Sequence, residues 1–253
     1  MNIVKIREVH IGEGMPKICV PIVEKTKEDI LRAAREIYDS VADLAEWRAD
    51  WYEDVFEVEA VLNVLEELRK ILKEKPLLFT FRTKEEGGER EMGAKQYAEL
   101  NAIVLKTGNI DLLDVEVFGQ PDAMTMLLQV AHEQGVKIIG SNHDFEKTPS
   151  REEIARRLCF MQDVGVDIAK IAVMPQKEED VKVLLEATKE VGARQDKCPV
   201  VAISMSSLGV ISRLMGEQYG SVITFGTLKK ASAPGQIHVN ELKKELEKVH
   251  KIL

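Results

Sequence analysis

Eight short apolar runs, separated by segments with helical periodicity, are the feature of this chain that most restricts its fold. Neighbouring runs begin roughly 20 to 35 residues apart, the length of one β-strand followed by one helix. The runs are KICVPIV near 17, LAEWRAD near 44, PLLFTFR near 76, IDLLDVEVF near 110, VKIIGSNHDF near 136, DIAKIAVM near 167, PVVAISMS near 199 and SVITFGTL near 221. We therefore predict an α/β protein: a (β/α)8 TIM barrel forming a single domain over residues 1–253.

The segments between these runs carry apolar residues at helical spacing, as at Ile154, Leu158 and Met161. The stretch TPSREEIARRL predicts a helix that begins after a Thr or Ser cap, with acidic residues in its first turn. A doubly wound open sheet is the alternative, but no Gly-x-Gly-x-x-Gly follows an early run. The loosely alternating IVKIREVHI at the start predicts a small hairpin that caps the bottom of the barrel.

Composition excludes several classes of function. A net charge of −8 argues against a general binder of nucleic acid or anionic membranes. The chain has no apolar run of about 20 residues, so we expect no membrane span, and its start lacks the apolar core of a signal peptide. Three scattered cysteines without a CxxC pair suit a reducing compartment, and we expect the cytoplasm.

Polar residues gather where the predicted strands end. In a barrel these C-terminal ends meet at one face, where active sites are built. The residues are Glu46, Arg48, Asp50, Arg82, Glu86, Asp114, Glu116, Ser141, His143 and Lys170. Each residue could instead have a purely structural role. Glu46 and Arg48 could form a salt bridge, and His143 could serve only as a hydrogen-bonding side chain. Solvation does not explain the set, because both faces of barrel strands are covered.

Lys170 stands in VDIAKIAVMP, a run that resembles a strand buried on both faces. Burial disfavours a charged amine, and Arg48, Arg82 and Arg213 would add like-charge repulsion. A neutral amine attacks a ketone or aldehyde, and the protonated imine then acidifies the neighbouring carbon. His143 is the natural proton shuttle for that step, and Glu86 would orient its imidazole. These residues predict a Schiff-base aldolase or dehydratase that needs no metal or cofactor.

The motifs EWRAD, LLFTFRTKEEGGE, SNHDFEKTP, KIAVMPQ, ISMSSLGVISR, YGSVITFG and KKASAPGQI resemble those of the type I 3-dehydroquinate dehydratases. They occur in order and cover nearly the whole chain. The resemblance implies a metal-free homodimeric barrel without cofactors. It also implies a hydro-lyase that dehydrates 3-dehydroquinate to 3-dehydroshikimate in aromatic amino-acid biosynthesis.

The resemblance also assigns roles. Lys170 would form the imine with the substrate ketone, His143 would act as base and then as acid, and Glu86 would support His143. Six residues would bind substrate: Glu46, Arg48 and Arg82 at the ring hydroxyls and ketone, and Arg213, Ser232 and Gln236 at the carboxylate.

Three features depart from the family pattern, and one of them, DVEVF, is a slight variant of the usual acidic strand end. Pro21 stands where many members have a serine, and Gly140 stands where a larger apolar residue is common. Two other functions remain open on the residues alone. One is a sugar-phosphate aldolase, which would bind phosphate at the loop after the eighth strand. The other is a non-catalytic small-molecule sensor that keeps the pocket.

Overall fold

All eight predicted runs form strands in the computed structural model, which describes residues 2–119, 121–194 and 196–252. They are β3 (Lys17–Ile22), β4 (Leu44–Arg48), β5 (Leu77–Thr80), β6 (Leu112–Glu116), β7 (Lys137–Asp144), β8 (Ile168–Val173), β9 (Val200–Ser204) and β10 (Ile223–Thr227). Consecutive strands pair in parallel from β3 to β9, and β10 pairs with β3. Val222 N–H donates to the Val200 carbonyl at 3.0 Å, which closes the ring between β9 and β10. The predicted barrel is confirmed, and the open-sheet alternative is wrong.

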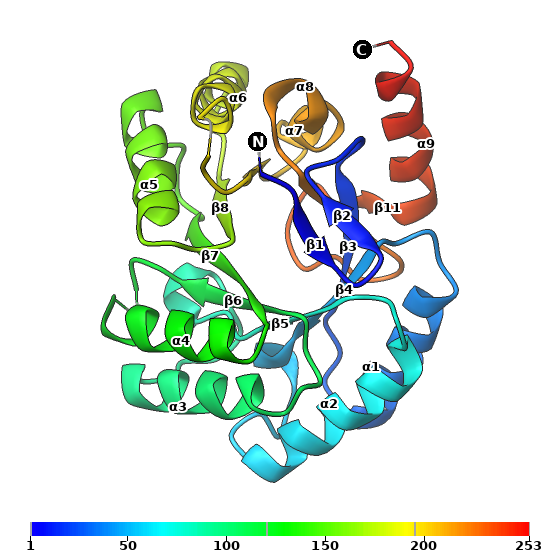
Figure 1. Ribbon diagram of the computed structural model, residues 1–253. Helices are drawn as coiled ribbons and strands as arrows, with labels where there is room; N and C mark the ends of the chain where they lie inside the picture. The colour runs from blue at the N-terminus through cyan, green and yellow to red at the C-terminus, as the bar shows by residue number, and fades with distance from the viewer. Residues whose placement is uncertain (1, 120, 195, 253) are drawn as a thin grey trace.

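Helices surround this ring (Figure 1). They are α1 (Lys27–Tyr38), α2 (Val58–Leu72), α3 (Ala94–Leu105), α4 (Pro121–Glu133), α5 (Arg151–Asp163), α6 (Glu178–Gly192), α7 (Val210–Leu214), α8 (Gly216–Tyr219) and α9 (Val239–His250), with 3-10 turns η1 (Ala49–Trp51) and η2 (Lys84–Glu86). The predicted cap of α5 is confirmed as Ser150, whose hydroxyl accepts from the Glu153 N–H. Within the described residues, no helix is both long and apolar enough to cross a membrane.

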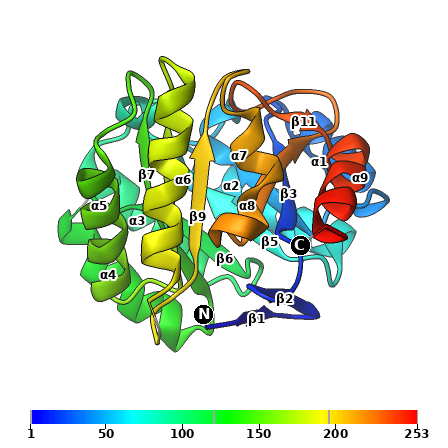
Figure 2. The same cartoon turned by 90° about the horizontal axis from the view of Figure 1, so that it is seen from above.

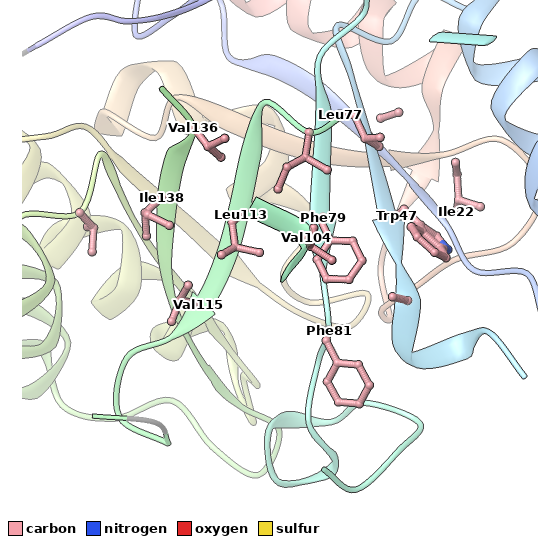
Figure 3. Packing of buried hydrophobic residues seen from close by; sticks show 14 of the residues in the cluster. Ile22, Trp47, Leu77, Phe79, Phe81, Val104, Leu113, Val115, Val136 and Ile138 are labelled. Carbon is pink, nitrogen blue, oxygen red and sulfur yellow. The ribbon is translucent and has the colours of Figure 1, made fainter. Parts of the chain in front are cut away.

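The main core lies between the strands and the helices. Side chains from alternate strand positions point outward there, as Figure 3 shows for Trp47, Phe79 and Leu113. The Trp47 and Phe79 rings meet edge to face, with centroids 5.5 Å apart. Because one parity of each strand fills this layer, the opposite parity faces the barrel interior.

Gly140 on β7 belongs to the outer layer. A Cβ atom at this position would lie 2.6 Å from Val166 Cγ1 and 2.9 Å from Val117 Cγ2. The two valines therefore already fill the space that a larger residue at position 140 would need.

The predicted hairpin is confirmed as β1 (Val4–Ile6) paired antiparallel with β2 (Val9–Ile11). Figure 2 shows it at the end of the barrel opposite the loop between β10 and β11 (Ile237–His238). Its buried Ile11 packs in one apolar cluster with Leu44 and Leu78 from the bottom of the barrel. Arg7, at the hairpin turn, donates from Nε to Asp111 Oδ1 at 2.6 Å. The hairpin therefore seals the lower end and leaves the upper end open.

The hairpin seal predicts a stability effect. Replacing Ile11, which is fully buried, with alanine should lower the free energy of unfolding by about 2–5 kcal/mol, because a cavity is left. Ile3→Ala is the control, since Ile3 is 54% exposed and its change should stay within about 0.5 kcal/mol. Urea unfolding measures both. Equal effects at the two positions would show that the hairpin does not pack as described.

Candidate active site

A cavity opens at the upper end of the barrel, at the C-terminal ends of the strands. Its empty volume is about 490 Å³. It is lined by Glu46, Arg48, Arg82, Gly87, His143, Phe145, Lys170, Ala172, Ile203, Met205, Arg213, Phe225, Ser232, Ala233 and Gln236. Eight of the nine predicted site residues line it, and Glu86 lies behind His143.

Arg82, at the end of β5, is the centre of a buried charge cluster. Its guanidinium donates to Asp114 Oδ1 at 2.6 Å and to Glu116 Oε1 at 3.0 Å. It also reaches Ser141 Oγ at 3.0 Å and Glu86 Oε2 at 3.4 Å. Buried carboxylates need such partners to remain ionised. Arg82 together with Lys170 holds the pKa of Asp114 below its usual value despite the burial.

Lys170 projects from β8 into this cluster, and only 5% of the residue is exposed. Its Nζ lies 3.3 Å from Asp114 Oδ2 and 4.7 Å from the centre of the Phe225 ring. The sequence alone predicts only arginines as charged neighbours of this amine. The structure corrects that view, because the carboxylate of Asp114 is the charged group that contacts Lys170 and offsets the arginines.

His143 and Glu86 form a buried pair beside Lys170. Glu86 Oε2 accepts from the backbone N–H of His143 at 2.9 Å and lies 2.9 Å from its ring Nδ1. Burial raises the pKa of Glu86 to about 8, while Arg82 opposes that rise. Burial, with Arg82 and Lys170, holds the pKa of His143 well below its usual value. The imidazole is therefore held neutral. When Glu86 is ionised it accepts from Nδ1–H, which leaves Nε2 available as a base.

The local sequence explains how Glu86 reaches this place. The turn η2 carries Glu86 over the end of β7 and ends at Gly87, whose φ is +84°. At Gly88 an added Cβ would lie 1.9 Å from the carbonyl oxygen of Arg82. The pair of glycines after Glu86 thus permits a left-handed turn and a close backbone approach that side chains would block.

A second group of polar residues stands on β4. Arg48 donates to both oxygens of Asp50, with Nε and Nη2 each at 2.8 Å. Asp50 also accepts from the backbone N–H groups of Arg82 and Glu89. Glu46 accepts instead from Thr80 Oγ1 at 2.9 Å. Arg48 therefore pairs with Asp50 rather than with Glu46, which leaves one side of Glu46 facing the cavity.

Arg213 differs from the other arginines of the cavity. It is 1% exposed, yet within the described residues it pairs with no carboxylate. Its Nη2 donates to the Pro234 carbonyl at 3.2 Å, and its Nε has no partner there. Burial lowers the pKa of Arg213 to about 10. Ser232 and Gln236 bond to each other beside it, with Gln236 Nε2 2.9 Å from Ser232 Oγ. A buried guanidinium without an anion is suited to bind one from outside.

The sequence named Asp114 and Ser141 as polar strand ends but assigned them no role. The signal that places them in the interior is strand alternation, because Asp114 shares a face with Glu116 and Ser141 shares a face with His143. Asn142 carries no such signal, because a residue of the opposite parity belongs to the outer face. No group of three or more His, Cys, Asp or Glu side chains in the described parts of the chain is arranged to hold a metal ion.

These features define the class: a (β/α)8-barrel enzyme whose cavity holds an amine, a histidine–carboxylate pair and an unmatched guanidinium. The family model for type I 3-dehydroquinase matches residues 18–252. The chain belongs to that family, and its activity is that of a 3-dehydroquinate dehydratase, a hydro-lyase of the shikimate pathway.

Known 3-dehydroquinate dehydratases align with this chain over nearly its full length and nearly all of their own. The 3-dehydroquinate dehydratase of Clostridioides difficile is 50% identical over 98% of this chain and 97% of its own length. That of Clostridium novyi is 47% identical over 100% of both chains. A solved type I 3-dehydroquinate dehydratase from Clostridium difficile, with covalently modified comenic acid, has a TM-score of 0.96 and 49% identity, covering 100% of this chain and 99% of its own.

The pKa shift of Glu86 predicts a pH effect on stability. A carboxyl group whose folded pKa is about 8 binds more protons when folded than when unfolded, so it lowers stability as pH rises toward 8. His143, with a lowered folded pKa, acts in the opposite direction, and only below its unfolded value of about 6.5. Between pH 6.5 and 8, Glu86→Gln should therefore lose less stability than the wild type. Urea unfolding at both pH values measures this.

Glu85→Gln is the matched control, because Glu85 is the exposed neighbour of Glu86. Its stability should follow the wild type across the same range. If the free energy of unfolding changes with pH in the same way in all three proteins, the raised pKa of Glu86 is contradicted.

Proposed function

We propose that Lys170 forms an imine with the ketone of 3-dehydroquinate and that this bond drives the dehydration. The observation that carries the proposal is the placement of Lys170 Nζ in a cavity shared with His143 and Arg213. The amine attacks the carbonyl carbon, and water leaves to give a protonated imine. The covalently modified comenic acid in the structure of the relative supports a site that forms covalent bonds with small acids.

His143 would then move the proton. Its Nε2 takes a proton from the carbon beside the imine carbon, and the electron pair moves into the iminium group to give an enamine. The imidazolium returns that proton to the leaving hydroxyl, so that one water departs. Hydrolysis of the remaining imine releases the product and restores Lys170. Glu86, 2.9 Å from Nδ1, would hold the ring and, in its ionised form, offset the transient positive charge of the imidazolium.

The two remaining groups of residues would bind the substrate. Glu46, Arg48 and Arg82 face the cavity from β4 and β5, at the place expected for ring hydroxyls and the ketone. Arg213 with Ser232 and Gln236 would bind the carboxylate. The 229–236 loop supplies few glycine amides, so a carboxylate suits it better than a phosphate dianion, and this disfavours the aldolase alternative. The intact lysine–histidine pair disfavours a sensor without catalysis.

The proposal has further parts that concern the whole protein. We expect a single domain over residues 1–253, a homodimer, and chemistry without a metal or cofactor. We also expect the protein to reside in the cytoplasm, and the free thiols of Cys19, Cys159 and Cys198 suit that compartment.

Borohydride trapping tests the roles of the lysine and the histidine. With 3-dehydroquinate present, reduction should leave a covalent mass on Lys170, and Lys170→Ala should lose both the mass and the turnover. His143→Ala should still be trapped at Lys170 but turn over about 10² to 10⁴-fold more slowly, because the base is gone while the amine remains. Peptide mass spectrometry and kinetics measure both.

The exposed Lys177 serves as a control, since Lys177→Ala should be trapped and active like the wild type. An adduct on another lysine would overturn the role of Lys170. Near-normal turnover in His143→Ala would overturn the role of His143.

Calorimetric titration tests the carboxylate site. Arg213→Ala should bind 3-dehydroquinate at least about tenfold more weakly, since a charge-assisted bidentate contact is lost. Gln236→Ala should show a smaller loss. A decarboxylated analogue should bind all three proteins weakly and alike. If the wild type binds the acid and its decarboxylated analogue equally, Arg213 does not hold the carboxylate.

A further inference from the structure

We propose that Arg157 and Asn142, two residues outside the cavity, form a positioning relay that orients Glu86 and through it His143. The inference rests on the proposed roles of Glu86 and His143 and adds to them. Neither Arg157 nor Asn142 lines the cavity, so both would act only through Glu86.

Three hydrogen bonds make the relay. Arg157 Nη1, on α5, donates to Asn142 Oδ1 at 2.9 Å. Asn142 Nδ2 donates to Glu86 Oε1 at 3.1 Å. The other oxygen of Glu86, Oε2, is hydrogen-bonded to His143 Nδ1 at 2.9 Å. Each oxygen of Glu86 thus has its own partner, so the carboxylate plane is set from both sides.

Arg157 decides which way the Asn142 amide faces. An amide can rotate by half a turn, and the rotated form would place its oxygen against Glu86 Oε1, acceptor against acceptor. A guanidinium has only donors, so it binds the amide oxygen and leaves the amide N–H groups toward Glu86. Glu153 in turn holds Arg157, with Arg157 Nε 2.7 Å from Glu153 Oε1.

The relay enters from the outer side of the barrel. Ser141 and His143 face the interior, so Asn142, between them on β7, faces α5. Asn142 is 8% exposed, and its bond to Glu86 lies in a region with little water to replace it. A helix on the outer layer therefore contacts the proposed catalytic pair through one strand residue.

The charges around Glu86 give the relay its expected effect. Burial raises the pKa of Glu86, Arg82 on β5 lowers it, Glu116 raises it, the Asn142 N–H lowers it, and Asp114 raises it. His143 is the other titrating neighbour, and Lys170 and Arg48 act on it from β8 and β4. Loss of the Asn142 donor removes a partner of the ionised Glu86 and should shift its titration to higher pH.

The experiment compares kcat and KM over pH 5–9 in four variants of the full chain. Asn142→Ala should lower kcat about tenfold, with KM changed less than about twofold. The acidic limb of the kcat profile, the pH range over which protonation of Glu86 lowers kcat, should move to higher pH by about half a pH unit or more. Arg157→Ala should shift the limb in the same direction by a smaller amount. Arg157→Lys should restore part of the loss, since an ammonium can also donate to the amide oxygen.

Arg156→Ala is the matched control. Arg156 pairs with the same Glu153 but is exposed and does not contact Asn142. Its pH profile should match the wild type. Circular dichroism of each variant checks that it is folded, and Arg157→Ala keeps the test decisive if Asn142→Ala does not fold.

The outcomes separate the relay from the proposed function. If the wild type is trapped at Lys170 and depends on His143, yet Arg157→Ala has the same pH profile as Arg156→Ala, the relay is overturned alone. A change in KM without a change in the limb would also overturn it. If trapping in the wild type occurs at another lysine, the proposed function fails irrespective of the relay.

Discussion

The burial of charge around Arg82 is the interaction on which the upper half of the barrel depends. A single guanidinium contacts Asp114, Glu116 and Glu86 in a place that water hardly reaches. The carboxylates of this cluster in turn determine the surroundings of the two groups proposed to carry the chemistry. Asp114 contacts Lys170, and Glu86 contacts His143. Removing any one charge would leave another buried without compensation, so the cluster behaves as one unit.

The barrel is divided along its axis into an apolar and a polar half. The lower interior is filled by residues such as Leu44, Leu78 and Ile168 together with the hairpin, so it supplies stability. Two residues further along the same strands, the interior turns polar at positions such as Glu46 and Lys170. The rigid lower half holds the backbone of the upper half in place, which limits how far the polar side chains can relax away from one another.

The fold and most of the site were predictable because both follow from strand periodicity. Alternation along parallel strands places Asp114 with Glu116, and Ser141 with His143, on one face irrespective of tertiary detail. The family motifs then proposed the roles of Lys170, His143 and Glu86. Sequence reasoning failed where a contact joins elements that are unrelated in spacing. The contact of Asp114 with Lys170 is such a case, because it depends on side-chain direction across the barrel. The partner of Arg48 was undecided for another reason, since Glu46 and Asp50 are each two residues away from it and spacing favours neither.

The sequence by itself determined the eight βα units, the sealed lower end and the set of polar residues at the upper end. These follow from local periodicity and from the rule that parallel strands end at one face. Only the tertiary structure decided which charge meets which. Strand periodicity does not separate Arg213 from Arg82, and only the family motifs gave them different roles. Within the described residues, Arg213 is buried without a carboxylate partner, whereas Arg82 contacts three carboxylates. The reason is physical: the energy of a buried charge depends on neighbours within a few ångströms, and those neighbours come from distant parts of the chain.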